Sequence, residues 1–251
     1  GISTIGNMVN LITTSSRERK KVTLLEGWTI EEIADELSRK LQIDTYKFIS
    51  LCKDFNFVHS LNIDAPSIEG FLFPDTYIFL SSYTEEQIIT VMVNQFFHNY
   101  KKYIKRYKGH TSMSLREITT MASIIQGEAM FDDEMETISS VYHNRLKRKM
   151  RLQADPTIQY IIPGKNIRLY NKHLKIDSPY NTYKNYGLPP GPINNPGLSA
   201  LKAAIHPDET QYLYFVADGE GRHIFTRNNE EHNKAKKVLQ RKRRELRRKK
   251  K

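Results

Sequence analysis

Residues 114–129 read SLREITTMASIIQGEA, and this stretch decides how the second half of the chain folds. Ser114 and Glu117 have the spacing of a capping box, in which two side chains bond each other's backbone N–H groups at the start of a helix. Apolar residues then recur at steps of three and four: Leu115, Ile118, Met121, Ala122 and Ile125. This period predicts a helix that begins after Ser114 and buries one stripe in a core.

Glu128 lies at the end of this stretch and continues the apolar stripe. At about 100° per residue it lies within about 60° of Met121, Ile124 and Ile125. Desolvation raises the pKa of an inward carboxyl, by up to about 3–5 units when burial is complete, and an acid protonated near neutrality can protonate a glycosidic oxygen. The alternative is a structural glutamate that reaches water past Gly127. Periodicity alone leaves both open.

The first part of the chain predicts a strand followed by two helices. Residues 21–27, KVTLLEG, have the composition of a short strand, and Thr29 with Glu32 forms a capping box for the first helix. The second helix starts near Asp44. Its inward face is expected to comprise Tyr46, Phe48, Ile49 and Cys52.

Residues 67–80, SIEGFLFPDTYIFL, predict a turning segment that returns beside the first strand. The resulting order of strand, helix, helix and strand resembles a LysM-like module, a small fold that binds glycans containing N-acetylglucosamine. A plain α+β packing domain is the alternative.

A long helix is expected to connect this subdomain to the rest of the chain. Thr84 and Gln87 form another capping box, the helical pattern continues to about Lys108, and Gly109 is placed to end it. The fold class is therefore α+β, with two domains. The expected limits are a LysM-like subdomain over 1–83, a connecting helix over 84–109, a mixed α+β domain carrying Glu128 over 110–233 and a basic tail over 234–251.

The net charge of +11 lies at one end of the chain. Residues 234–251 hold twelve Lys or Arg against one acid, while residues 1–233 hold equal numbers of basic and acidic residues. The run RKRRELRRKKK would bind any polyanion, nucleic acid included, but no aromatic residue interleaves it to stack on bases. A solvated helix end that frays into a tail explains the same pattern, so no nucleic-acid partner is expected.

Several other features bear on the class of protein. The chain has no run of about 18 apolar residues, and its first residues lack the apolar region of a signal peptide. Cys52 stands alone, so an intrachain disulfide is excluded and a buried thiol is expected. The eight histidines show no HxxxH spacing, so we expect no metal and no cofactor.

Five segments occur in one order in the second half: ASIIQGEA (122–129), VYHNRLKRKMRLQADPTIQY (141–160), SPYNTYKNYGLPPGPINNPG (178–197), SALKAAIHPDETQYLYFVADGEGRHIF (199–225) and EEHNKA (230–235). Together they closely resemble the endolytic murein transglycosylase family, the YceG-like proteins. The likeness is strong over about 110–235 and looser over 20–80, where the LysM-like part lies.

This resemblance implies an enzyme that cuts the β-1,4 bond between N-acetylmuramic acid and N-acetylglucosamine in peptidoglycan glycan strands. Glu128 would protonate the linking oxygen and then accept a proton from the muramic C6 hydroxyl as it attacks C1, leaving a 1,6-anhydro end. The family motif has two glutamates two residues apart. Here the first position is Gln126, so the resemblance assigns catalysis to Glu128 alone. Gln126 points about 160° away from Glu128 on the helix wheel, so we expect it to lie outside the pocket.

Three other classes of protein remain as alternatives. A lysozyme-type hydrolase would share Glu128 but release reducing ends. A glycan-binding module without activity would keep the LysM-like part, and a basic-tailed nucleic-acid-binding protein would explain the charge at the C-terminal end.

Polar and aromatic residues elsewhere in the family motifs are candidates for sugar binding. The amide, guanidinium and hydroxyl candidates are Asn144, Arg145, Gln153 and Thr157. A second group, suited to stacking on rings and bonding acetamido groups, is Tyr180, Asn181, Thr182 and Tyr183. Asp155 before Pro156 predicts an N-cap for a helix over 157–162 rather than a catalytic group.

Two further segments have clear local patterns. Residues 187–197, GLPPGPINNPG, are too rich in Pro and Gly for a helix or strand and predict a surface loop. Residues 211–225 predict a hairpin with DGEG as its turn, in which His223 is a structural histidine on the same side as Phe225.

The resemblance also implies where the protein works. It suggests an N-terminal membrane anchor absent from this chain, a catalytic domain on the periplasmic side of the cytoplasmic membrane, and cell-wall synthesis proteins as possible partners.

Overall fold

The computed structural model describes residues 18–105, 111–164 and 168–249, with side chains described as far as Arg241. The chain forms two compact units: Gly1–Lys102 with Asn194–Gly197, and Tyr103–Ile193 with Leu198–Lys251. Both units contain helices and a two-stranded antiparallel sheet, which confirms the α+β class. The predicted boundary near residue 110 lies outside the described residues, so the domain limits stay predictions.

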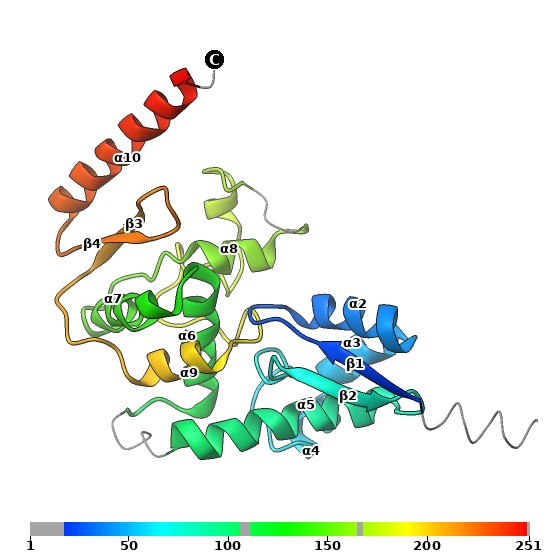
Figure 1. Ribbon diagram of the computed structural model, residues 1–251. Coiled ribbons are helices and arrows are strands. Elements are labelled where there is room, and N and C mark those ends of the chain that lie inside the picture. The colour runs from blue at the N-terminus through cyan, green and yellow to red at the C-terminus, as the bar shows by residue number, and fades with distance from the viewer. Residues whose placement is uncertain (1–17, 106–110, 165–167, 250–251) are drawn as a thin grey trace, which may run out of the picture. The chain divides into compact units, whose positions relative to one another are not determined.

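The first unit follows the expected order with one additional short helix. Its elements are β1 (Arg19–Thr23), α2 (Ile30–Leu41), α3 (Thr45–Lys53), α4 (Phe55–Ser60), β2 (Thr76–Leu80) and α5 (Glu85–Asn99), followed by a π-helical turn at Tyr100–Ile104 (Figure 1). β1 begins and ends earlier than predicted, and it pairs with β2 from Arg19 opposite Leu80 to Thr23 opposite Thr76. The predicted helix end at Lys108 and Gly109 lies outside the described residues.

Local sequence signals explain where these helices begin. The capping boxes predicted at Thr29 with Glu32 and at Thr84 with Gln87 are both present. In α3, Phe48 and Cys52 are fully buried as predicted, but the expectation that Tyr46 faces inward is wrong, since it is 89% exposed. The two positions from Tyr46 to Phe48 turn the helix by about 200°, so both cannot face the same core.

A buried amide organises the first unit. Oδ1 of Asn195 accepts the backbone N–H groups of Gly70 and Leu72, both over 2.9 Å. Its Nδ2 donates to the Trp28 carbonyl and to Oε1 of Glu69, again over 2.9 Å. Asn195 and Glu69 are both buried. The four bonds use the whole hydrogen-bonding capacity of this amide and fix residues 194–197 in the first unit.

The segment 187–197 is a loop, as its composition predicts, but it is not a surface loop throughout. Residues 191–197 are buried. Their backbone can leave water because distant side chains replace it: Ser123 accepts the Ile193 N–H over 3.0 Å, and Trp28 O accepts the Asn195 N–H over 2.8 Å.

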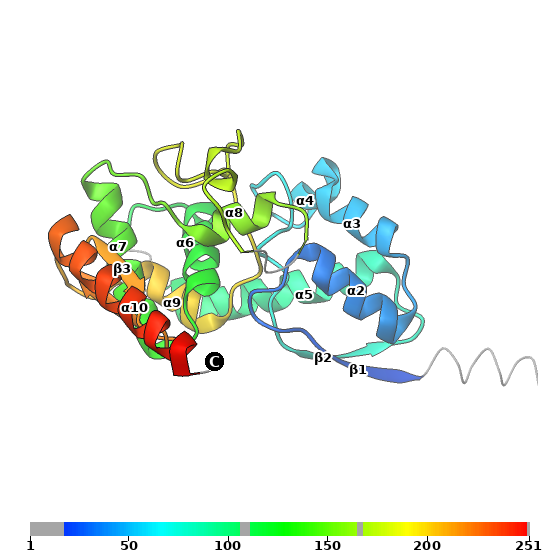
Figure 2. The same cartoon turned by 90° about the horizontal axis from the view of Figure 1, so that it is seen from above.

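The second unit is built around α6 (Leu115–Glu128), which contacts the helices α7, α8 and α9 (Figures 1 and 2). The other elements are the 3₁₀ turns Asp132–Glu134 and His173–Lys175, α7 (Met135–Lys147), α8 (Asp155–Ile161), α9 (Leu198–Ile205), β3 (Tyr214–Ala217), β4 (His223–Thr226) and α10 (Asn229–Lys249). The Ser114 and Glu117 capping box opens α6 as predicted.

α6 is enclosed on every side rather than along one stripe. Every residue from Ile118 to Ile125 is buried, including three hydroxyl residues. Thr119 donates to the Leu115 carbonyl, Thr120 to Arg116 and Ser123 to Thr120. These bonds within the helix satisfy the hydroxyls and allow polar residues to enter the core.

The C-terminal part confirms the predicted hairpin and extends the folded unit. β3 and β4 pair antiparallel, and the His223 ring lies beside that of Phe225 while its Nδ1 is 3.2 Å from Oε2 of the buried Glu134. The segment expected to be a tail from residue 234 belongs to α10, which packs on this hairpin with Leu239 buried. In the described part of the chain, no helix has the length and apolar character needed to cross a membrane.

Candidate active site

Glu128 is the last residue of α6, where the helix emerges from the core. Its side chain is only half-exposed, and burial raises the pKa of the carboxyl from 4.5 to about 7. The helix period predicts an inward carboxyl with a raised pKa, and the pKa of Glu128 is raised by burial. A carboxyl with such a pKa can both give and accept a proton near neutrality.

Tyr142, from the middle of α7, holds the carboxylate of Glu128. The phenol hydroxyl donates to Oε1 over 2.7 Å, and the Tyr142 side chain is 1% exposed. This bond favours the ionised carboxylate and so opposes the effect of burial on the pKa of Glu128. The positive charge of Arg145 acts in the same direction.

Asp155, the first residue of α8, completes the surroundings of Glu128. Its backbone N–H bonds the Glu128 carboxylate and lowers the pKa, while its negative charge raises that pKa. Oδ1 of Asp155 accepts the Tyr183 hydroxyl over 2.5 Å. The prediction that Asp155 caps α8 is wrong: Ala154 is the N-cap residue, without a side-chain bond.

The reason lies in the two threonines beside this helix start. Thr157 donates its hydroxyl to the Ala154 carbonyl over 2.7 Å, and Thr182 Oγ1 accepts the Ala154 N–H over 2.9 Å. These two bonds fix the backbone of Ala154, which becomes the N-cap residue. The side chain of Asp155 bonds the Tyr183 hydroxyl and does not cap the helix.

Two chain segments lie side by side here, and hydrogen bonds join Asp155 to Tyr183, Gln153 to Thr182 and Arg151 to Lys184. The first segment contains two non-glycine residues in the left-handed region, Lys149 with φ 53° and Gln153 with φ 51°. Such residues persist where the surrounding contacts impose them, and they cluster at functional sites. Four elements therefore converge on Glu128: α6, α7, α8 and the loop that carries Tyr183.

Comparisons with known proteins agree with this picture. The sequence matches the model of the YceG-like family over residues 3–238. This chain belongs to the YceG-like family. A Bacillus subtilis (strain 168) protein named endolytic murein transglycosylase is 40% identical over 234 residues, which cover 86% of this chain and 64% of that protein. A protein of the same name from Streptococcus pneumoniae serotype 2 (strain D39) is 31% identical over 239 residues, covering 85% and 43%.

A solved structure is similar as well. The crystal structure of a yceG-like protein from Listeria monocytogenes matches with a TM-score of 0.79 and 38% identity, covering 85% of this chain and 75% of that one. The YceG-like chain described here thus spans less than two thirds of the length of the two curated relatives.

Two of the predicted sugar-binding residues of this YceG-like protein donate hydrogen bonds to backbone carbonyl groups. Nδ2 of Asn144 donates to the carbonyls of Thr210 and Tyr212 over 2.9 and 3.0 Å. The buried Arg145 donates from Nε to the Leu213 carbonyl and from Nη1 to the Leu152 carbonyl, both over 2.6 Å. These contacts fix the segments around Glu128, and a role in sugar binding stays a prediction.

Three others form the frame of the site. Thr157, Asn181 and Thr182 are buried, and the hydroxyls of the two threonines lie 2.9 Å apart. Nδ2 of Asn181 donates to the carbonyls of Leu174 and Ile176.

The remaining candidates have side chains that solvent reaches. Gln153 is exposed, Tyr180 and Tyr183 are half-exposed, and the Tyr180 ring lies 5.0 Å from that of Tyr160. Gln126 is also half-exposed. These side chains can meet a ligand without unfolding the site.

Sequence reasoning missed Tyr142 and misassigned Asp155. A signal for Tyr142 existed: it follows Ile138 and Val141 on a buried helix, and a buried tyrosine hydroxyl needs a partner. Its partner, Glu128, lies 14 residues away, and only the packing of α7 on α6 brings them together. Among the described residues, no group of three His, Cys, Asp or Glu side chains is arranged to hold a metal ion.

Proposed function

We propose that this chain is a lytic transglycosylase that cleaves the bond between N-acetylmuramic acid and N-acetylglucosamine in peptidoglycan glycan strands. The observation that carries the proposal is Glu128, whose pKa of about 7 suits a group that donates and then accepts a proton. The names of the two curated relatives, endolytic murein transglycosylase, support murein as the substrate.

The proposed reaction uses one carboxyl twice. Protonated Glu128 gives its proton to the linking oxygen as the bond from that oxygen to muramic C1 breaks, and the N-acetylglucosamine part leaves with a free C4 hydroxyl. The Glu128 carboxylate then accepts the proton of the muramic C6 hydroxyl, whose oxygen bonds C1. Glu128 ends protonated, and no water is consumed.

The neighbours of Glu128 support both steps. Tyr142 and the Asp155 N–H donate to the carboxylate and stabilise the form left after the first proton transfer. Burial and the charge of Asp155 disfavour that form, and they raise the pKa of Glu128 so that the carboxyl stays protonated near neutrality.

Product analysis by mass spectrometry tests this proposal. Purified peptidoglycan digested with the wild type is expected to give muropeptides one water lighter than hydrolysis products. Glu128→Gln keeps the shape of the side chain but not its acid, and should lower the rate by at least about a thousandfold. Glu136→Gln is the matched control because Glu136 is an exposed residue of α7. Full activity of Glu128→Gln would exclude Glu128 as the acid.

A lysozyme-type hydrolase is the second candidate, and the position of Asp155 near Glu128 is the observation that favours it. A hydrolase needs a second carboxylate, either as nucleophile or as the base for water. Such an enzyme would release reducing ends, and Asp155→Asn would then abolish activity. In the transglycosylase, Asp155→Asn should still yield anhydro products.

The remaining parts of the proposal rest on family likeness. We propose that the first unit is LysM-like and binds the glycan strand, and that the protein works on the periplasmic side of the cytoplasmic membrane, held by an N-terminal anchor, beside cell-wall synthesis proteins. Titration of N-acetylglucosamine oligomers into the Glu128→Gln chain by calorimetry tests the first point, because glycan binding by the first unit predicts a second binding site besides that at residue 128. Cell fractionation of the native protein tests the second.

A further inference from the structure

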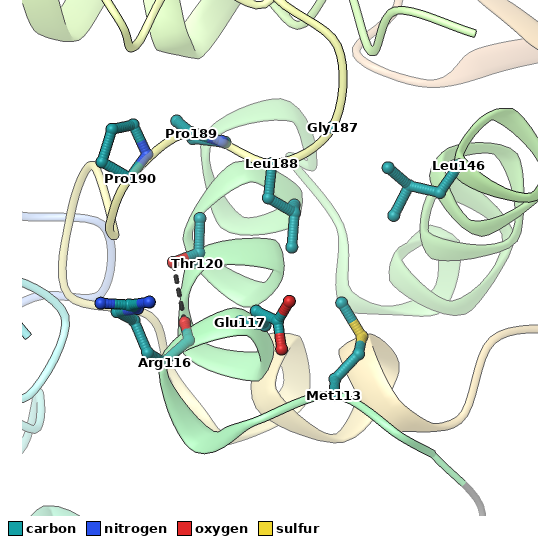
Figure 3. Close-up of a pocket in the computed structure, with 9 residues that line it drawn as sticks. All are labelled: Met113, Arg116, Glu117, Thr120, Leu146, Gly187, Leu188, Pro189 and Pro190. Carbon is teal, nitrogen blue, oxygen red and sulfur yellow. Dashed lines mark hydrogen bonds between the residues drawn. The ribbon is translucent and has the colours of Figure 1, made fainter. Parts of the chain in front are cut away.

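A groove lies on the second unit at the other end of α6 from Glu128. A cavity of about 440 Å³ opens between the start of α6, Leu146 of α7 and the loop Gly187–Pro190 (Figure 3). A second hollow of about 600 Å³ adjoins it, since both are lined by Leu146 and Gly187. We call the two together the Leu146 groove. Its apolar lining includes Met113, Leu146, Met150 and Leu188.

The groove is separate from the Glu128 site but connected to it. Thr120, which lines the groove, lies eight residues before Glu128, or about 12 Å along the helix axis. The two paired segments described above run from the Glu128 site to the groove. Asp155 and Tyr183 lie beside Glu128, and Tyr186, which Arg151 covers, lines the groove.

Among the described residues, two cations and one acid line the groove. Arg116 and Lys149 line it, and neither forms an ion pair with a residue in the described part of the chain. The guanidinium of Arg151 stacks over the exposed Tyr186 ring at 4.4 Å. The acid is Glu117, whose carboxylate accepts the Ser114 N–H and hydroxyl at the helix start and also interacts with the charge of Arg116.

An apolar floor beside the side chains of Arg116 and Lys149 suits a short peptide with carboxylates and small apolar side chains. A stripped glycan strand offers hydroxyl and acetamido groups and one lactyl carboxylate on each muramic residue, which is held close to the sugar ring, whereas a stem carries carboxylates away from the ring. In peptidoglycan such a peptide hangs from the lactyl group of N-acetylmuramic acid, the sugar whose bond the proposed reaction breaks. Five extended residues span up to about 17 Å, compared with about 12 Å along the helix axis from Glu128 to Thr120 at the near edge of the groove.

We propose that the Leu146 groove binds the peptide stem of the muramic residue being cleaved. This inference rests on the proposed function. It makes the groove a determinant of substrate choice: strands that carry stems bind through both sites, whereas stripped strands bind through the Glu128 site alone.

Paired substrates test the proposal. Cleavage of peptide-bearing glycan strands is compared with cleavage of the same strands stripped by an amidase, for the wild type and for Arg116→Gln combined with Lys149→Asn. Asparagine is chosen because it tolerates the left-handed backbone of Lys149. The control is Lys147→Gln, since Lys147 is exposed and lines neither hollow.

The wild type is expected to prefer peptide-bearing strands. On these strands the double variant should lose about fivefold in kcat/KM, because its KM rises. Its rate on stripped strands should be unchanged. Equal loss on both substrates would assign the groove to the glycan or to folding and overturn the proposal. Equal rates of the wild type and the double variant on peptide-bearing strands would overturn it too.

A binding measurement separates this inference from the proposed reaction. Synthetic stem peptide is titrated into the Glu128→Gln protein by calorimetry, at low and high salt. The groove is supported if the peptide binds, if salt weakens this binding and if the double variant does not bind. This holds even if neither substrate is cleaved, and in that case only the proposed function fails. Absence of binding to Glu128→Gln at millimolar peptide would contradict the groove while leaving the reaction intact.

Discussion

Tyr142 donates to Oε1 of Glu128 over 2.7 Å and lowers the pKa of that carboxyl, which burial nevertheless raises to about 7. Since Tyr142→Phe removes the donor and keeps the ring, the pKa of Glu128 should rise further. Glu128 must be protonated to start the proposed reaction, so activity falls as pH rises through its pKa. We expect the alkaline limb of the kcat/KM profile to move up by about one pH unit in Tyr142→Phe.

The control for this measurement is Tyr77→Phe. Tyr77 is also buried and donates its hydroxyl to the Phe73 carbonyl over 2.6 Å, but it belongs to the first unit. Its removal should leave the pH profile in place. An alkaline limb in Tyr142→Phe that coincides with that of the wild type would mean that Glu128 is not the group that titrates.

Single residues differ in how far the sequence predicts them. The helical period of residues 115–128 predicts that Glu128 faces inward, because the direction of its side chain depends only on the helix that contains it. Tyr142 and Asp155 depend on contacts between helices, which periodicity does not reveal. Cys52 was predicted to be buried and is, whereas Tyr46 was assigned to the same face although the helix turn excludes it.

At the scale of elements, one hydroxyl fixes the loop 187–197 to α6. Ser123 Oγ accepts the Ile193 N–H over 3.0 Å and donates to the Thr120 carbonyl over 2.8 Å. Ser123→Ala would leave a buried N–H without its acceptor. We expect a loss of about 1–3 kcal/mol in the free energy of unfolding, measured by urea titration.

Thr119→Val is the comparison for Ser123→Ala. Thr119 is equally buried on α6, but its hydroxyl donates to the Leu115 carbonyl and accepts no backbone N–H in the described contacts. The isosteric change should cost less than Ser123→Ala. The reverse order would show that Ser123 does not hold the loop.

Element starts were the most predictable part of the fold. All three capping boxes, at Thr29, Thr84 and Ser114, were read from spacing because each involves residues three positions apart. The burial of Thr119 and Ser123 could not be read in this way, since hydroxyl residues indicate a solvent face until the helix is seen to be enclosed. The buried part of the loop 187–197 depends on partners more than sixty residues distant.

At the scale of the whole molecule, the chain returns to its first unit late in the sequence. Residues 194–197 belong with Gly1–Lys102, although the chain on both sides of them belongs to the second unit. Composition suggested a single crossing near residue 110 because a four-residue return leaves no signal in composition or period. The bonds of Asn195 to Gly70, Leu72 and Glu69 specify it instead.

The returning Asn195 donates to a buried acid of the first unit, Glu69, which makes the stability of the protein depend on pH. Glu69 is 2% exposed, and burial raises the pKa of its carboxyl from 4.5 to about 8, against the bond from the Ile30 N–H. Below pH 4.5 the group is protonated in both the folded and unfolded chains. Between about 4.5 and 8 the unfolded chain releases a proton that the folded chain keeps, so stability should fall as pH rises.

The change is measured as the difference in unfolding free energy between the wild type and Glu69→Gln, by urea titration at pH 5 and pH 8.5. Glu128 titrates in both proteins, so its contribution cancels. Glutamine replaces one of the two oxygens with an NH₂ group, which faces the donor of either Ile30 or Asn195 and gives a constant offset, but it carries no proton to lose. We expect Glu69→Gln to gain several kcal/mol relative to the wild type over this range, with about 4–5 kcal/mol as the upper limit. A difference that does not vary with pH would mean that Glu69 is ionised in the folded protein, with its charge stabilised by the Asn195 amide.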